Sequence, residues 1–395
     1  MRRLLCAGLG LIALQVPAQN APKLKQSMEL GVEGRAFLES AAYPKQEGSG
    51  VSLSIRPEWD LAITHGNFRF APFARWDQHD GERTHVDIRE LTVRKRYGNF
   101  DLLAGVGRVF WGTTESLHLM DIVNQSDLVE NPDGEEKLGQ PMLNLAWTTS
   151  LGVFSGFVLP LHRERLLPGE KGRLRAPLPY DRDDPEYEAD REEQHIDTAL
   201  RWSLSRGALD LGLSHFHGTA REPRFELRPD GAELELVSIY DQIDRSGLDV
   251  SLVRGGWLLK LEAIHEHSRV DDYAAAVGGF EYTIASAFRS TWDVGLLAEY
   301  LWDERGKISP SPFQNDVFVG TRLAANDIAG TELLAGGIID LDRDAWFVNL
   351  EASRRIGNSA KLVLELRMFS GSDEADPISA FRRDDYVQLE YIHYF

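Results

Sequence analysis

The sequence of 395 residues is poor in cysteine, in basic residues and in long apolar runs. Its single cysteine is Cys6, so it cannot build a disulfide framework. Lysine and arginine number 43 against 62 aspartates and glutamates, for a formal net charge of −19. A nucleic-acid-binding protein needs a basic face, and this balance argues against that class. No internal stretch approaches the roughly 20 apolar residues of a membrane-spanning helix. A search for long apolar runs does not detect segments in which only every second side chain is apolar.

The first 18 residues have the order of an export signal. Arg2 and Arg3 precede an apolar stretch over residues 4–16, and a small-residue cleavage pattern ends at Ala18. This order predicts a signal peptide over residues 1–18, with a short buried helix as the alternative. Because Cys6 would leave with the signal, the mature chain would hold no thiol and no disulfide.

Most of the remaining chain alternates between apolar and polar residues. Between Val51 and Ile63 the odd positions are almost all apolar and the even positions are almost all polar. The same period of two recurs over residues 68–76, 292–302, 346–352 and 362–368. It is typical of strands with one apolar and one polar face. Many apolar faces end in an aromatic residue, such as Trp59, which suits a membrane interface. A soluble β-sandwich could also alternate, but it would need a second sheet to cover these faces.

The connections between these strands alternate in length. Short turns, such as Tyr97-Gly98-Asn99 and Gly357-Asn358, separate longer polar connections. Short turns at one end and long loops at the other are typical of outer-membrane barrels. Pairing the strands as hairpins predicts an all-β fold, a transmembrane antiparallel up-and-down β-barrel of about 18 strands, or 16, over residues 28–395. Residues 19–27 would form a short periplasmic segment before it. Residues 89–97 shift phase, which indicates a bulge.

The C-terminal strand adds a second sign. Val387, Leu389, Tyr391 and Phe395 share one face, and Phe395 is the last residue. The pattern is similar to the terminal strand by which outer-membrane barrels are handed to the barrel-assembly machinery. His393 departs from it, because an apolar or aromatic residue is usual at that step.

Taken together, residues 28–395 resemble a Gram-negative bacterial outer-membrane barrel of the porin type. A shorter stretch, with Gly107–Gly112 and Asp121–Asp127, resembles a segment of poorly characterised porin-like proteins. The resemblance implies a bacterial outer-membrane location, contact with outer-membrane lipid and lipopolysaccharide, and passive diffusion of small hydrophilic solutes or ions without enzymatic activity. General porins are often trimers, so a homo-oligomer stays open.

The third long connection, residues 111–141, is the expected seat of selectivity. In general porins the loop at this place folds into the barrel and narrows it, and the resemblance implies the same here. Glu115, Asp121, Asp127 and Glu130 are the acids predicted for this constriction. Rings of one charge select ions by sign, so an acidic constriction would favour cations. A solvated external loop is the alternative.

Arginines on predicted lumen faces suggest an opposing basic wall. These are Arg56, Arg69, Arg75, Arg201, Arg322 and Arg367. Acidic residues are interleaved with them. Cross-strand ion pairs that brace the barrel are therefore the alternative to a transverse field across the lumen.

No cofactor, metal centre or catalytic residue is predicted. The connection over residues 160–194 is dense in carboxylates that could hold Ca²⁺ or Mg²⁺, but it lacks the spacing of a calcium-binding loop. His215-Phe216-His217 and His265-Glu266-His267 each place two imidazoles on one strand face. We expect these histidines at strand ends near the membrane interface rather than around a metal.

Enzyme signatures are missing. The sequence contains no G-x-S-x-G elbow, phosphate-binding loop or H-E-x-x-H helix. Eleven histidines still allow a hydrolytic group at the barrel rim. A membrane-embedded hydrolase, and an exporter or carrier for a hydrophobic or polymeric compound, are therefore the alternatives to a channel.

Overall fold

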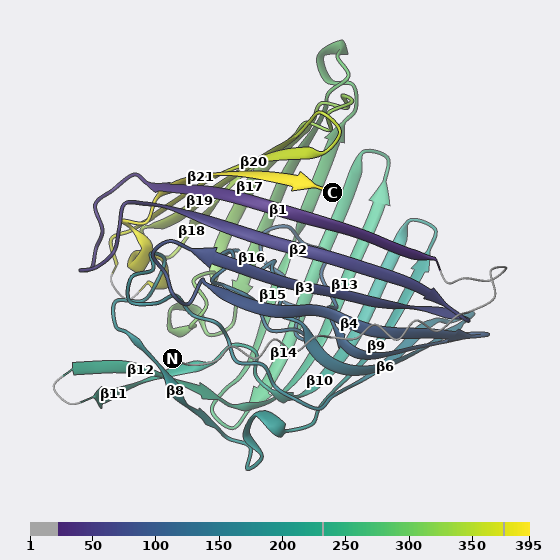
Figure 1. The fold of residues 1–395 in the computed structure, drawn as a ribbon, viewed down its shortest axis with the longest axis horizontal. Helices are drawn as coiled ribbons and strands as arrows, with labels where there is room; N and C mark the ends of the chain where they lie inside the picture. The colour runs from purple at the N-terminus through teal and green to yellow at the C-terminus, as the bar shows by residue number, and fades with distance from the viewer. Residues whose placement is uncertain (1–22, 231–232, 374–375) are drawn as a thin grey trace, which may run out of the picture.

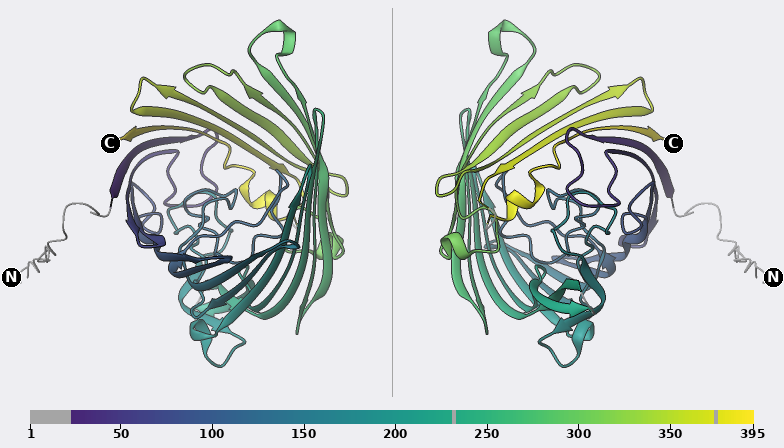
Figure 2. Two further views of the ribbon diagram at one scale, coloured as in Figure 1. Left: turned by 90° about the vertical axis from the view of Figure 1, so that its right-hand side faces the viewer. Right: turned by 90° about the vertical axis from the view of Figure 1, so that its left-hand side faces the viewer.

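The computed structural model describes residues 23–230, 233–373 and 376–395 and shows a closed antiparallel barrel of 18 strands. Each barrel strand pairs with the barrel strand that follows it in the chain, and the last barrel strand pairs with the first, as Figures 1 and 2 show. The barrel strands are β1 (Leu24–Phe37), β2 (Ser49–Ile63), β3 (Gly66–Asp77), β4 (His85–Tyr97), β5 (Phe100–Gly107), β6 (Gln140–Thr149), β7 (Gly152–Leu159), β9 (Asp197–Arg206), β10 (Leu209–Thr219), β13 (Gln242–Arg254), β14 (Trp257–Ser268), β15 (Asp272–Ile284), β16 (Asp293–Asp303), β17 (Asn315–Ala324), β18 (Glu332–Asp340), β19 (Ala345–Ile356), β20 (Ala360–Gly371) and β21 (Tyr386–Tyr394).

A small second sheet lies among the long loops. It has three strands, β8 (Tyr180–Tyr187), β11 (Arg224–Asp230) and β12 (Glu233–Tyr240), with β12 in the middle. Four short 3₁₀ helices complete the described elements: η1 (Glu192–Gln194), η2 (Ala287–Arg289), η3 (Gly306–Ile308) and η4 (Pro377–Phe381). No helix in the described residues is long and apolar enough to cross a membrane.

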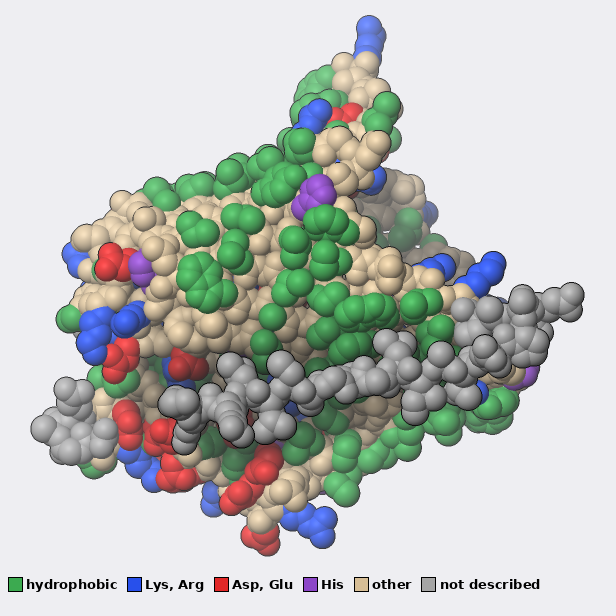
Figure 3. Space-filling model, viewed as in Figure 1, with side chains coloured by type: hydrophobic (Ala, Val, Ile, Leu, Met, Phe, Trp, Pro, Cys, Tyr) green, Lys and Arg blue, Asp and Glu red, His purple; other side chains and the backbone are tan. Residues whose placement is uncertain are grey.

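The period of two in the sequence decides which side chains face outward. On β2, Ser52 and Ser54 are buried inside, whereas Leu53 points outward. Leu53 pairs with Val32 of β1 and with Trp76 of β3, and all three are about half exposed. Figure 3 shows such apolar side chains spread over the barrel wall, with charged side chains gathered towards its ends. The outer surface is therefore suited to lipid.

The two ends of the barrel differ as expected. Five connections at one end are two-residue turns, at 64–65, 98–99, 150–151, 207–208 and 255–256. Gly98 adopts a φ of +57° in such a turn, a conformation that favours glycine. Long loops occupy the other end. We name them L1 (38–48), L2 (78–84), L3 (108–139), L4 (160–196), L5 (220–241) and L9 (372–385).

The prediction of an 18-stranded all-β barrel is confirmed. β1 begins at Leu24, within the segment expected to precede the barrel. The proposed signal peptide, residues 1–18, lies outside the described residues. The phase shift near residue 89 is a bulge: Ala71 pairs with Glu90, the next residue Pro72 pairs with Ile88, and Arg89 is the extra residue. The bulge places Arg89 inside the barrel.

Candidate channel constriction

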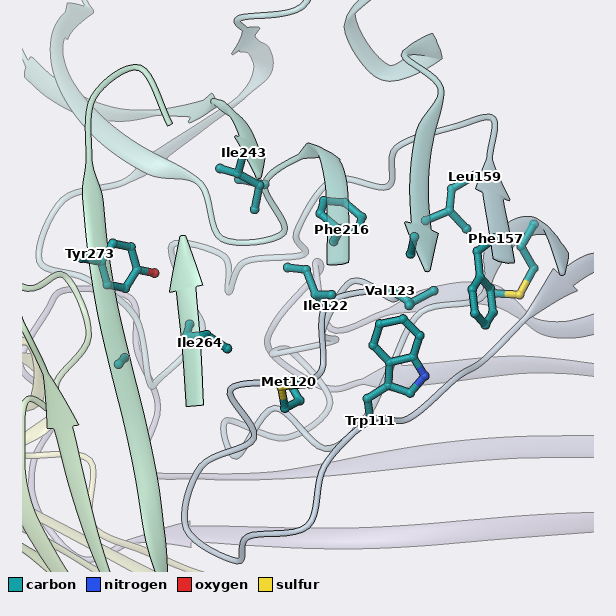
Figure 4. Close-up of a cluster of buried hydrophobic side chains, with 14 residues drawn as sticks. Trp111, Met120, Ile122, Val123, Phe157, Leu159, Phe216, Ile243, Ile264 and Tyr273 are labelled. Atoms are coloured by element: carbon teal, nitrogen blue, oxygen red, sulfur yellow. The ribbon is translucent and has the colours of Figure 1, made fainter. Parts of the chain in front are cut away.

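L3 folds into the barrel and packs against the inner wall. Trp111, Met120, Ile122 and Val123 of L3 are buried in one apolar cluster, together with inward-facing side chains of the wall (Figure 4). The main wall members are Phe157 and Leu159 on β7, Phe216 on β10, Ile243 on β13, Ile264 on β14 and Tyr273 on β15. Burying one such side chain contributes about 1.5–3 kcal/mol, so the cluster holds L3 against these strands.

A buried carboxylate on β14 fixes the first limb of L3. Oε1 of Glu262 accepts hydrogen bonds from the backbone N–H groups of Thr113 and Thr114, at 2.6 and 3.0 Å, and from the Thr114 hydroxyl at 2.7 Å. Oε2 accepts the N–H of Met120 at 3.0 Å. Hydrogen bonds to an ionised group are stronger than neutral ones. Glu262 is fully buried and acts as a clamp on the L3 backbone.

A second carboxylate, on β16, holds the same limb. Glu299 accepts the N–H groups of Glu115 and Ser116, each at 2.8 Å, and the Ser116 hydroxyl at 2.6 Å. With its N–H held on the wall, Glu115 directs its own carboxylate to Arg322 of β17 at 2.7 Å and to Lys260 of β14 at 3.4 Å.

The other limb of L3 reaches a different part of the wall. Glu130 accepts a hydrogen bond from Arg75 of β3 at 2.7 Å. Asp127 contacts Arg89 of β4 at 2.5 Å and His85 at 3.2 Å. The β4 bulge thus aims a cation at L3.

Contacts with β20 complete the span. Asp133 of L3 pairs with Arg367 at 2.7 Å, and Asn131 reaches Glu365 at 3.4 Å. L3 therefore touches β14 and β16, then β3 and β4, and finally β20, and so crosses the interior. Figure 2 shows chain segments inside the barrel in a view along its opening. A loop held to several parts of the wall narrows the lumen.

The four predicted acids of L3 differ in their surroundings. Three of them have side chains that are at most 2% exposed: Asp121, Asp127 and Glu130. Asp121 pairs with Lys137 at 2.9 Å. Glu115 keeps 18% exposure. The structure thus brings three of the acids into buried ion pairs and leaves Glu115 partly exposed in its pair with Arg322.

The buried acids titrate differently from free carboxylates. Burial raises the pKa of Asp121, and Lys137 offsets this only in part. Burial alone would also raise the pKa of Asp127, but hydrogen bonds from His85 and Arg89 hold it below its ordinary value. The Asp127 carboxylate is therefore stabilised in its ionised form.

The six predicted lumen arginines lie on β2, β3, β9, β17 and β20 and do not form one continuous wall. Each has an acidic partner. Arg56 and Arg75 approach Glu130, Arg69 contacts Glu58 and Glu90, Arg201 contacts Asp249, Arg322 contacts Glu115, and Arg367 contacts Asp133. The cation of Arg201 also lies 5.1 Å from the Trp111 ring centroid.

From the sequence alone, neither Glu262 nor Glu299 was assigned a role in holding L3. Alternation places both on inward faces. Their partners are backbone N–H groups about 140 to 185 residues away, and backbone groups leave no mark in a sequence.

The C-terminal strand closes the barrel on β1. Leu389, Tyr391 and Phe395 are exposed on the outside. The N–H of Phe395 donates to the carbonyl of Met28 at 2.9 Å, and its ring lies 4.5 Å from that of His393. The proposed assembly signal is thus displayed at the barrel surface.

The histidine pairs lie on the outer wall at the long-loop end. His215 and His217 approach Asp244 at 3.6 and 2.9 Å, and on the neighbouring strands His265 and His267 approach Asp272 at 2.9 and 3.4 Å. Across the described ranges, no group of three or more His, Cys, Asp or Glu side chains is placed to hold a metal ion.

Comparisons with known proteins give the fold. No protein-family model and no curated protein sequence matches the chain. OccAB1 of Acinetobacter baumannii is a similar solved structure, with a TM-score of 0.56 and 8% sequence identity over 94% of this chain and 96% of that one. OccK8 of Pseudomonas aeruginosa has a TM-score of 0.54 and 10% identity, over 94% of this chain and 98% of that one. A BenF-like porin from Pseudomonas fluorescens has a TM-score of 0.51 and 10% identity, again over 94% of this chain and 98% of that one. The chain has the fold of these proteins, and the resemblance to a porin-type barrel is confirmed at that level. This fold, with an apolar outer surface, supports an outer-membrane location.

Proposed function

We propose that the protein is an outer-membrane channel through which small hydrophilic solutes or ions diffuse passively. The observation that carries the proposal is L3, which is held across the interior of an 18-stranded barrel by Glu262 and Glu299 on one side and by Arg75 and Arg367 on the other. A barrel of this size leaves an aqueous lumen that a loop can narrow.

Selectivity would come from the charges that stay exposed at the constriction. Glu115 and Arg322 form a partly exposed pair, as do Arg56 and Glu136. Buried pairs such as Asp127 with Arg89, whose side chains are at most 6% exposed, have little contact with ions in the lumen. Glu115 is therefore our leading candidate for a cation preference.

The partners follow from the same proposal. The C-terminal strand would be read by the barrel-assembly machinery, and the outer wall would contact lipid and lipopolysaccharide. Three acids of L4 contact cations of other loops: Glu170 contacts Lys45, Glu186 contacts Arg228 at 2.6 Å and Glu188 contacts Arg269. We therefore assign these three acids to ion pairs between loops rather than to a Ca²⁺ or Mg²⁺ site.

A membrane hydrolase is the main rival. Ser246 lies 2.9 Å from Nδ1 of His215 on the outer wall, and Asp244 lies 3.6 Å from the other ring nitrogen. These residues sit on paired strands of the barrel, where backbone N–H groups are engaged in the ladder. Such N–H groups are not free to bind an oxyanion, so we favour the channel.

Single-channel recording tests the proposal. The mature protein is refolded and placed in a planar bilayer, and the reversal potential is measured in a KCl gradient. Discrete open steps would support a channel. A folded barrel that never conducts would contradict it and would direct attention to phospholipid or peptide hydrolysis and to a carrier.

A further inference from the structure

Part of L4, which we call the L4 strap (residues 166–175), lies over the other loops at the long-loop end of the barrel. L4 joins β7 to β9, and β20 lies nine strand positions from β9 in either direction round the ring, on the opposite side. The strap nevertheless reaches L9, the loop that follows β20. On the way it contacts L3, L2 and L1, which follow one another round the ring between L4 and L9. The strap therefore runs along the rim above β1 to β4, at the end that faces the cell exterior in an outer-membrane barrel.

The strap is fastened to three other loops on its way. The N–H of Gly169 donates to Asp80 of L2 at 3.1 Å. Gln46 of L1 donates to the carbonyl of Gly172 at 2.7 Å. Leu166, at its start, forms an isolated bridge with Asp127 of L3. These contacts are polar and lie at separate points, so they can be broken without unfolding the barrel strands.

The tip of the strap is anchored by a buried ion pair and by Leu174, which packs against the apolar cluster of Phe369, Ile378 and Tyr386. Nε of Arg173 donates to Asp384 of L9 at 2.5 Å, and both side chains are 3% exposed. The Arg173 cation also lies 4.2 Å from the ring centroid of Phe37. Asp384 additionally accepts the N–H of Leu174 at 3.1 Å. Leu174 has a φ of +60°, which is uncommon for leucine, so the anchor holds the chain in a strained conformation.

The strap roofs the limb of L3 that carries the constriction acids. A small cavity of about 60 Å³ lies between them, lined by Arg83 of L2, by Val129 and Pro132 of L3, and by Pro168 and Arg173 of the strap. A solute entering from the long-loop end on this side would meet the strap before it met Glu130.

We propose that the L4 strap is a gate at the extracellular mouth. It is closed when Arg173 is docked on Asp384, and it opens when the tip leaves this anchor and uncovers L3. The gate rests on the channel function proposed above, because it controls access to that lumen.

A reversible tether tests the gate. Lys45 of L1 and Glu170 of the strap form an ion pair whose side chains are both about 60% exposed, so both can be replaced with little effect on folding. The only cysteine of the chain, Cys6, lies in the predicted signal peptide. A K45C/E170C variant can therefore be bridged selectively by a bis-methanethiosulfonate reagent and released by reductant. We expect the bridged channel to lose most of its open events and the reduced channel to regain them.

Controls separate the gate from the channel itself. The single variants K45C and E170C, treated with the same reagent, should conduct like the untreated protein. Equal conductance of the bridged and reduced double variant would overturn the gate and leave the channel intact. An absence of conductance in both states, with a folded barrel, would overturn the channel and the gate together.

Removal of the anchor between Arg173 and Asp384 is a second test of the gate. Arg173→Ala removes the docked cation and should increase the open time. Arg382→Ala is the matched control, because Arg382 is an exposed arginine in the same loop as Asp384. An unchanged open time in Arg173→Ala, with normal barrel assembly on a heat-modifiability gel, would contradict the proposal.

Discussion

Arg75 and Glu130 join the barrel wall to L3 through one buried contact, a hydrogen bond of 2.7 Å from Nε of the arginine to Oε1 of the glutamate. The same guanidinium group contacts Glu33 at 2.9 Å and Ser52 at 2.5 Å. One lumen arginine and one L3 acid, both expected to act on permeating ions, are thus engaged with each other. The contact between them holds L3 in position against the barrel wall.

Arg75→Ala should strongly destabilise the protein. The substitution removes the arginine that the buried carboxylates of Glu33 and Glu130 contact. Breaking a buried ion pair lowers the free energy of unfolding by about 3–5 kcal/mol. Urea unfolding in detergent measures the loss. Arg96→Ala is the control, since Arg96 pairs with Asp101 at an exposed site, where a pair contributes about 0–1 kcal/mol. Equal effects of the two variants would contradict the assigned role.

Glu262→Gln should loosen L3 and raise the single-channel conductance. The amide nitrogen of glutamine cannot accept the N–H of Met120, and each lost hydrogen bond to a charged group costs about 1.5–3 kcal/mol. Conductance and protease cleavage within L3 should rise together. Glu266→Gln, on the same strand but paired with Arg245, should leave both unchanged. A rise in neither measurement would show that L3 does not depend on Glu262.

Glu115→Gln should shift ion preference towards anions. The change removes a partly exposed negative charge and leaves the cations of Arg322 and Lys260 without this partner. Asp127→Asn should shift the reversal potential less, because Asp127 is buried against Arg89. Reversal potentials in a KCl gradient decide between them. A larger shift for Asp127→Asn would move the selective site deeper into L3.

His162 should make the packing of L4 sensitive to acid. Burial and Arg221, whose guanidinium nitrogen lies 3.0 Å from Nδ1, lower the pKa of His162 from 6.5 to about 2. The unfolded imidazole binds a proton below about pH 6.5 whereas the folded one stays neutral, so stability falls as the pH drops from there towards 2.

Hydrogen exchange of L4 at neutral and acidic pH measures this effect. The slope should be at most about 1.4 kcal/mol per pH unit for one group. His162→Asn keeps an acceptor for Arg221 but cannot titrate, so the pH dependence should weaken. The same slope in His162→Asn would assign the acid sensitivity to other groups.

The sequence by itself determined the barrel. Alternation on β2 or β16 is a local property, since neighbouring side chains on a strand must face opposite sides. Glycine at Gly98 and Gly357 marks turns for an equally local reason, the positive φ that each adopts. Even the β4 bulge at Arg89 was visible as a break in the alternation.

Only the tertiary structure decided what L3 and L4 do. The partners of Glu262, Glu130 and Arg173 are set by where long loops fold back inside a closed ring. The sheet of β8, β11 and β12, built from L4 and L5, was not foreseen for the same reason. Long loops have no period that fixes their path, and their contacts join residues far apart in the chain. The barrel follows from short-range stereochemistry, whereas the constriction and the strap at its mouth follow from long-range contacts, apolar as well as charged.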